Sequence, residues 1–246
     1  MDKKTLDPML AHTLIQSVAT ASVEKISSPF VVSRLHSNHI EPHSGENKTI
    51  TIEDLPAGHH RWDIPESASL TLTFLLNHPH SVTIDLYLTG PHAHVDVAGL
   101  VLTDTGTPTL TINQYHLAPD TTSKVLIKGI LAGATRAQLR GLVTITDAAI
   151  RSTASHYHKV LLLDPSARCT AIPSFAVHHH QVRCNHGAAV GKLAIDQLAY
   201  LQSRGIPEPH ARHLMTLGFA QEVTERATPE QQAIWHEKIA LLTKGA

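Results

Sequence analysis

The chain has 246 residues, enough for one large β domain with an appendage or for two small domains. Lys and Arg number 20 against 21 Asp and Glu, which argues against nucleic acid, a membrane surface or an acidic ligand as partner. Two cysteines cannot form a disulfide framework, and the start MDKKTLDPML lacks the apolar segment of a secretory signal. We therefore expect a cytoplasmic protein with reduced thiols. Histidine is unusually abundant, at 20 residues.

The N-terminal stretch, residues 1–48, predicts a helix, a strand and a polar connector. Residues 5–20 fit a short amphipathic helix with Thr5 as N-cap. Its apolar positions recur every four residues, at Leu6, Leu10, Leu14 and Val18. The strand-like FVVSRL follows from Phe30, and a turn-rich connector leads to residue 48.

Residues 49–190 predict a long series of β-strands. Segments such as SLTLTFLL and SVTIDLYL alternate apolar and polar positions, and Gly, Pro, Asn or Asp separates them. Their spacing of about ten residues suits a sandwich, a barrel or a β-solenoid. Two features favour the solenoid: the region has no Asn-Gly or Asp-Gly hairpin signal, and single glycines recur within or beside its strands. These glycines are Gly90, Gly99, Gly129 and Gly141.

Residues 191–246 predict a C-terminal subdomain of three short helices. Gly205 and Pro207 end the first helix. In the second helix, one face is expected to carry Ala211, Leu214, Met215, Gly218 and Phe219. The sequence TPEQ from Thr228 is a capping box with proline at the first helical position, and it opens the third helix. The apolar stripes of these helices need a partner surface.

Cys184 and His186 are the first candidates for chemistry. They lie two residues apart, in what we expect to be a glycine-bracketed loop between the strands and the helices, and an extended segment would point both to the same side. Such a pair is more often a small buried thiol and a hydrogen-bonded imidazole. Thiolate and imidazole are also suitable ligands for iron or zinc. Two ligands do not close a four-coordinate site, so the others would come from a second subunit or from elsewhere in this chain.

Further histidines occur in pairs spaced to share a strand face. Their rings could form a metal-binding ladder, although such positions are more often simply solvated. The pairs are His78 with His80, His92 with His94, His156 with His158, and His178 with His180. We include His178 and His180 as candidate metal ligands because they lie close to Cys184 in sequence. Cys169 is expected in the core, and no Walker-type motif indicates a nucleotide site in this chain.

The run CNHGAAVGKL, followed by QLAYLQSRGI, resembles the SufB/SufD family of iron–sulfur cluster assembly proteins. Members of that family carry C-x-HGAT-x-G and then FYL-x-SRGI. The resemblance implies a mainly β fold, with a right-handed parallel β-helix core between a short N-terminal helix and a C-terminal helical subdomain. The chain departs from the family pattern at Ala176 and at Gln181, where acidic residues are usual.

The resemblance also implies a function. The chain would be a non-enzymatic scaffold subunit, with Cys184 and His186 holding iron or an iron–sulfur cluster transiently. Its partners would be a SufC-like ABC ATPase and either a SufB-like subunit or a second copy of this chain. Partner-binding residues are then expected on the C-terminal helices, at Tyr200, Arg204, Leu214 and Phe219. Two alternatives remain open, a histidine-rich β-fold metalloenzyme and a passive metal-binding module.

Overall fold

The computed structural model describes residues 31–32 and 41–244, and the helix expected at residues 5–20 lies outside them. Two sheets form the body of the described part, and successive strands alternate between them from β2 onward. The first sheet has the order β1-β2-β4-β6-β8-β10-β12. Its strands are β1 (Val31–Val32), β2 (Asn47–Ile52), β4 (Ser69–Leu76), β6 (His94–Thr103), β8 (Thr122–Leu131), β10 (Thr153–Leu162) and β12 (Arg183–Lys192). The second sheet has β3 (Gly58–Ile64), β5 (Ser81–Leu88), β7 (Thr109–His116), β9 (Arg136–Ile145) and β11 (Arg168–Val177).

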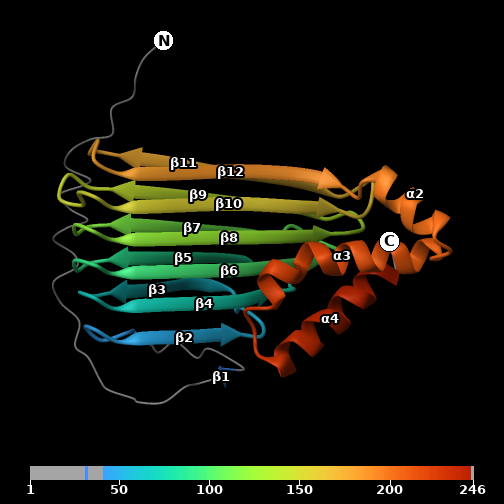
Figure 1. Cartoon of the computed structure of the whole chain (residues 1–246), viewed down its shortest axis with the longest axis horizontal. Coiled ribbons are helices and arrows are strands. Elements are labelled where there is room, and N and C mark those ends of the chain that lie inside the picture. The colour runs from blue at the N-terminus through green and yellow to red at the C-terminus, as the bar shows by residue number, and fades with distance from the viewer. Residues whose placement is uncertain (1–30, 33–40, 245–246) are drawn as a thin grey trace, which may run out of the picture.

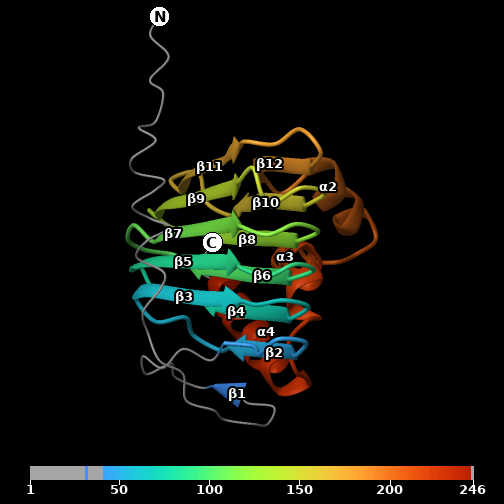
Figure 2. The same cartoon turned by 90° about the vertical axis from the view of Figure 1, so that its left-hand side faces the viewer.

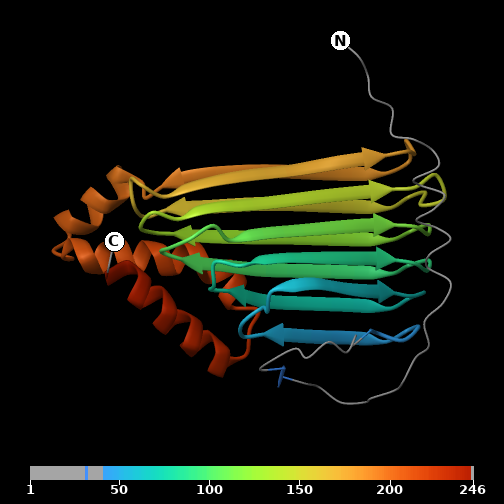
Figure 3. The same ribbon diagram turned by 180° about the vertical axis from the view of Figure 1, so that it is seen from behind.

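All neighbouring strands in both sheets are parallel, so each coil of chain stacks on the one before it. Figures 1 and 3 show this stack from opposite sides, and Figure 2 shows β11 and β12 together at one end of it. Equivalent residues line up from coil to coil: Leu72 lies opposite Val97, and Val97 lies opposite Val125. The predicted parallel β-helix is therefore confirmed, and the sandwich and the barrel are not formed.

The space between the two sheets is filled by the inward members of each alternating pattern. Aliphatic side chains dominate in the early coils, and Ile64, Leu72, Phe74 and Ile84 are fully buried there. A large inward side chain needs room from the neighbouring coil. A Cβ added at Gly99 would lie 2.3 Å from the Phe74 ring, so this glycine accommodates the phenylalanine.

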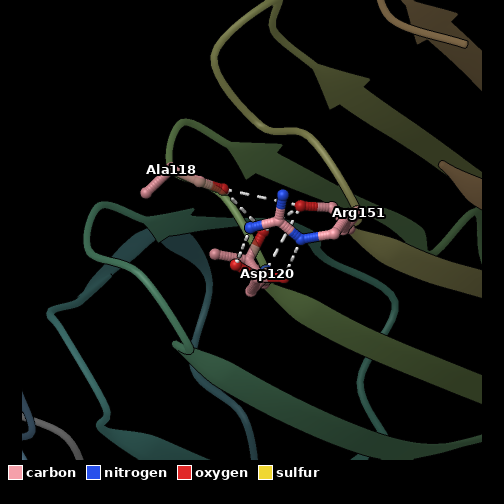
Figure 4. Close-up of polar contacts among 5 residues, drawn as sticks. Ala118, Asp120 and Arg151 are labelled. Atoms are coloured by element: carbon pink, nitrogen blue, oxygen red, sulfur yellow. Dashed lines mark hydrogen bonds and ion pairs between the residues drawn. The ribbon is translucent and has the colours of Figure 1, made fainter. Parts of the chain in front are cut away.

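At one turn of the β-helix, a residue with left-handed backbone conformation recurs in successive coils. Ser67, His92, Asp120 and Arg151 have φ between 55° and 61°, and each backbone N–H donates to a carbonyl of the next coil. Figure 4 shows the last two of these turns, where the Arg151 guanidinium clamps the Asp120 carboxylate. Its Nε–Oδ1 distance is 2.7 Å and its Nη2–Oδ2 distance is 2.5 Å. The bidentate pair lowers the pKa of Asp120 and links two successive turns at the surface.

Three helices follow the last strand: α2 (Ile195–Ser203), α3 (Glu208–Thr224) and α4 (Pro229–Lys244). Helices α3 and α4 lie on the outer face of the first sheet (Figure 1), where Trp235, Ile239 and Val223 pack against Leu100 and Leu161. The sheet thus buries the apolar stripe of α4 and part of that of α3, whereas α2 has no buried residue. No helix in the described ranges is long and apolar enough to cross a bilayer.

The local signals of the helices are partly confirmed. At the start of α4, Thr228 N–H donates to the Gln231 side chain and Gln231 N–H donates to Thr228 Oγ1, so the capping box is formed. The face predicted for the second helix is wrong in part, because Leu214 and Gly218 are exposed. Small residues form the buried face of α3 because they allow close approach to the flat sheet; they are Ala211, Thr216, Ala220 and Val223.

Candidate functional site

Cys184 and His186 lie on β12, the last strand of the β-helix. The loop predicted at this position is therefore wrong. The strand pairs with β10 along its whole length, Cys184 opposite Ala154 and His186 opposite His156. The parallel neighbour supplies hydrogen bonds that the short, glycine-rich segment would lack by itself. Both residues belong to the inward face, since Ala154 and His156 are buried, and no further coil of the described residues covers them.

The Cys184 thiol is partly covered by an apolar group at one end of the last coil. It packs with Phe175 and Val182 against the buried cluster Val143, Ile145, Ala149 and Ala154. This burial raises the pKa of the thiol above its ordinary value. A free Cys184 is therefore a thiol at neutral pH, and it would have to lose its proton before it could bind a metal ion.

The His186 ring is exposed and stacks on Phe175, with ring centroids 4.4 Å apart and an interplanar angle of 27°. Phe175 thus contacts both candidate ligands, from the neighbouring strand β11. The ring orients His186 across the open end of the β-helix. A thiol and an imidazole are then held on one surface, two residues apart along an edge strand.

His178 and His180 lie in the turn between β11 and β12, with both side chains exposed. The stacked neighbour of His180 is His179, at a centroid distance of 5.2 Å. Nowhere in the described ranges do three His, Cys, Asp or Glu side chains come together as a possible metal site. Cys184 and His186 are consequently not completed to a metal centre by His178 or His180 within this structure.

The remaining histidine pairs differ in position. His156 and His158 share the inward face of β10 as predicted, and both are buried. The shared strand face is wrong for the others, because His78, His80, His178 and His180 lie in turns and His92 precedes β6. Polar imidazoles suit turns, where they find carboxylates and carbonyls: His78 pairs with Asp54 at 3.0 Å, and His80 contacts the Leu55 carbonyl. A metalloenzyme would need several histidines to converge in one cavity. Of these pairs, His156 and His158 meet inside the β-helix, and within the described ranges no third His, Cys, Asp or Glu completes a metal group with them.

Sequence reasoning missed a polar interior beneath the candidate site. Gln114, His116 and Ser123 are fully buried in the coil of β7 and β8. His116 hydrogen-bonds Thr121 Oγ1 at 2.7 Å and Ser123 Oγ at 2.8 Å. The signal that could have found them is the alternation of inward and outward positions along the strand. In TLTINQYH, Gln114 and His116 fall at the same alternate positions as Leu110 and Ile112, so their side chains point inward.

The four predicted partner-binding residues do not share one environment. Tyr200 and Leu214 are exposed, at 57% and 49%. The Arg204 guanidinium lies 5.2 Å from the Tyr200 ring centroid. Phe219 instead packs in the second core, and its carbonyl accepts a hydrogen bond of 2.7 Å from the Lys128 ammonium. Phe219 therefore serves contact between α3 and the sheet, whereas the other three side chains are exposed.

The fold defines a class of protein: a parallel β-helix followed by a helical subdomain, with a thiol and an imidazole on the inward face of its last strand. Comparison with known proteins agrees. Residues 58–219 match the family model described as SUF system FeS cluster assembly, SufBD core domain. This match spans more than half of the chain, so the chain belongs to the SufBD family, as the resemblance implied.

Several similar proteins are named as iron–sulfur cluster assembly proteins of the same family. A SufBD family protein of Mycobacterium tuberculosis is 30% identical over 167 residues, which is 65% of this chain and 19% of the relative. SufD of Escherichia coli K12 is 32% identical over 108 residues, 44% of this chain and 26% of that protein. A Synechocystis relative is 30% identical over 130 residues, 53% of this chain and 28% of the relative. The chain thus matches only about a fifth to a quarter of the length of these relatives.

Proposed function

We propose that the chain is a scaffold subunit for iron–sulfur cluster assembly, with no catalytic step of its own. Cys184 and His186 would hold iron or a nascent cluster transiently, as cargo, at the open end of the β-helix. The observation that supports this is the placement of both side chains on the inward face of β12, the last strand, which no other coil of the described part covers.

A second subunit would cover this end. Strands β11 and β12 are the edge strands of their sheets, and an unpaired edge offers N–H and C=O groups to another chain. The inward residues Val177 and Val190 of the last coil are 40% and 43% exposed, whereas their neighbours Ile145 and Val160 are buried. Two copies would bring two thiols and two imidazoles together, which is the number that a four-coordinate site needs. A SufB-like partner with its own cysteine would serve equally.

The helical subdomain would bind the SufC-like ABC ATPase, which would supply the energy of nucleotide hydrolysis. The exposed side chains Tyr200, Arg204 and Leu214 form the candidate surface, together with Ile195, which is 79% exposed. Large apolar side chains at such exposure are typical of protein contacts. The free thiols of Cys169 and Cys184 suit a reducing compartment, and we place the protein in the cytoplasm.

Anaerobic reconstitution tests the site. The chain is purified with its partners, supplied with iron and sulfide, and compared with Cys184→Ala and His186→Ala by bound iron and by visible absorbance. We expect both variants to lose most of the bound iron, and Cys169→Ala, the other thiol of the last coil, to retain it. Equal iron in the wild-type chain and in the two site variants would contradict the proposal.

A pull-down tests the partner. The ATPase should be recovered with the wild-type chain and lost with a Tyr200→Ala, Leu214→Ala double variant. Ile172→Ala, an exposed apolar residue on the second sheet, is the matched control and should retain the ATPase. Failure to recover any ATPase with the wild-type chain would favour the passive metal-binding module.

A further inference from the structure

A group of polar side chains lies inside the β-helix, one coil beneath Cys184 and His186. His156 and His158 project inward from β10 and are each 1% exposed, and Gln114 of β7 is fully buried. The two imidazoles face each other through their Nε2 atoms, which are 2.8 Å apart. The Gln114 amide nitrogen donates to His156 Nδ1 at 2.7 Å.

The hydrogen bonds of this group are incomplete. Because His156 Nδ1 accepts from Gln114, the ring proton of His156 lies on Nε2 and is donated to His158 Nε2. His158 must then carry its proton on Nδ1, and that atom has no partner. The Gln114 amide oxygen has none either. Buried polar atoms without partners are unfavourable, so this arrangement is not explained by stability.

The neighbouring strand leaves room for one of the imidazoles. Gly141 of β9 faces the His156 ring, and a Cβ added there would lie 2.3 Å from its Cε1 atom. The backbone of β9 can therefore approach the ring closely, which holds it in place without filling the space. The ring of His156 is fixed by Gly141 on one side and by Gln114 at Nδ1.

We propose that His156 and His158 are the two fixed ligands of an internal site for a divalent transition-metal ion, Zn²⁺ or Fe²⁺. Two nitrogens bound to one tetrahedral zinc at about 2.0–2.1 Å are about 3.3 Å apart. The observed Nε2–Nε2 distance of 2.8 Å needs to widen by only about 0.5 Å to admit the ion. Neutral imidazole is a suitable ligand for both metals.

Gln114 supports this site from the outer shell. When a metal takes both Nε2 atoms, the ring proton of His156 moves to Nδ1, and no proton is gained or lost. The Gln114 amide then turns over, so that its oxygen accepts from His156 Nδ1–H. This contact is the usual outer-shell partner of a metal-bound histidine, and it uses the oxygen that has no partner in the metal-free arrangement.

The ion would reach this site from the end of the stack formed by β11 and β12. His186 lies directly opposite His156 on the neighbouring strand β12, and among the described strands none lies beyond it. Water, a small anion or the His186 imidazole can therefore complete the coordination. The inner site depends on His156, His158 and Gln114, and it is independent of the Cys184 thiol on which the proposed function rests.

Metal binding to the full chain tests the inference. Cys184→Ala is used as the background, so that the outer site is removed, and binding of Zn²⁺ alone or Fe²⁺ alone is measured anaerobically by equilibrium dialysis. We expect one ion per chain to be lost in His156→Gln and in His158→Gln. Gln114→Leu should weaken that ion about 10–100-fold. Comparison of the two metals shows which of them the site prefers.

His116→Gln is the matched control, because His116 is equally buried but has partners at both ring nitrogens. It should retain the ion. Should either histidine variant fail to fold, ¹⁵N spectra of the wild-type imidazoles decide, since one equivalent of Zn²⁺ must shift both Nε2 signals of the pair. Unshifted signals, or full binding by His158→Gln, would overturn the inner site. Loss of iron only in Cys184→Ala would overturn it too, while leaving the proposed function intact.

Discussion

Protonation of His116 should make the fold sensitive to mild acid. The His116 ring lies in the interior, between the side-chain oxygens of Thr121 and Ser123, and burial lowers its pKa to about 4. The same histidine in the unfolded chain titrates near pH 6.5. Between these two values the unfolded chain binds a proton that the folded chain excludes.

The sign and size of the effect follow from linkage. The contribution of His116 to stability is complete above about pH 6.5 and is lost as the pH falls toward about 4. At pH 5 the loss is about 2 kcal/mol relative to pH 7.5, and below pH 4 it approaches about 3.4 kcal/mol. A loss of about 2 kcal/mol is large against a total of about 5–15 kcal/mol for a typical domain.

Urea unfolding at pH 7.5, 6 and 5 measures how much stability the fold loses as the pH falls. His116→Gln loses its hydrogen bonds at every pH but has no proton to gain, so its stability should fall by about 2 kcal/mol less than wild type over this range. His178→Gln, an exposed turn histidine, is the control and should keep the wild-type slope. Equal pH dependence of wild type and His116→Gln would show that the buried imidazole is not excluded from protonation as argued.

Three further substitutions test the packing and can be followed by denaturant unfolding. Gly141→Ala should destabilise the chain by about 1–3 kcal/mol because its Cβ would collide with the His156 ring, and Gly191→Ala, with open space around it, should not. Trp235→Ala should cost about 3–5 kcal/mol, since the indole is fully buried between α4 and the sheet, whereas exposed Leu241→Ala should cost little. Thr228→Ala should cost about 1 kcal/mol through loss of the α4 cap; no measurable change would refute the role of the capping box.

The β-helix was only partly visible in the sequence pattern. Alternation of apolar and polar residues marks the strands but also fits a sandwich or a barrel, and the lack of tight hairpin signals only favours the solenoid. The resemblance of CNHGAAVGKL and QLAYLQSRGI to the SufB/SufD family decided between them. The glycines proved informative for a reason that the sequence does not show. Gly99 and Gly141 accept the Phe74 and His156 rings from adjacent coils, so their role is visible only when the register is known.

The Cys184–His186 site stays a prediction, but its expected setting in a loop was wrong. A segment such as CNHGAAVGK has no strand-like character of its own, and it becomes a strand because β10 offers it a complete parallel ladder. The exposed side of α3 was also misjudged. A helix lying on a flat sheet buries small residues at closest approach, so Ala211 and Ala220 face inward while the larger Leu214 faces solvent.

Buried polar groups join the apolar interior in the later coils. In the early coils Leu72 and Ile84 have apolar neighbours above and below, and each added coil buries more apolar surface. From β7 onward the interior also holds the Gln114 amide and the imidazoles of His116, His156 and His158, beside apolar residues that continue the core. Buried imidazoles and amides need hydrogen-bond partners, so these coils depend less on apolar contact alone. The proposed second subunit would therefore have to meet two kinds of group on the last coil, the exposed apolar side chains Val177 and Val190 and the His186 imidazole.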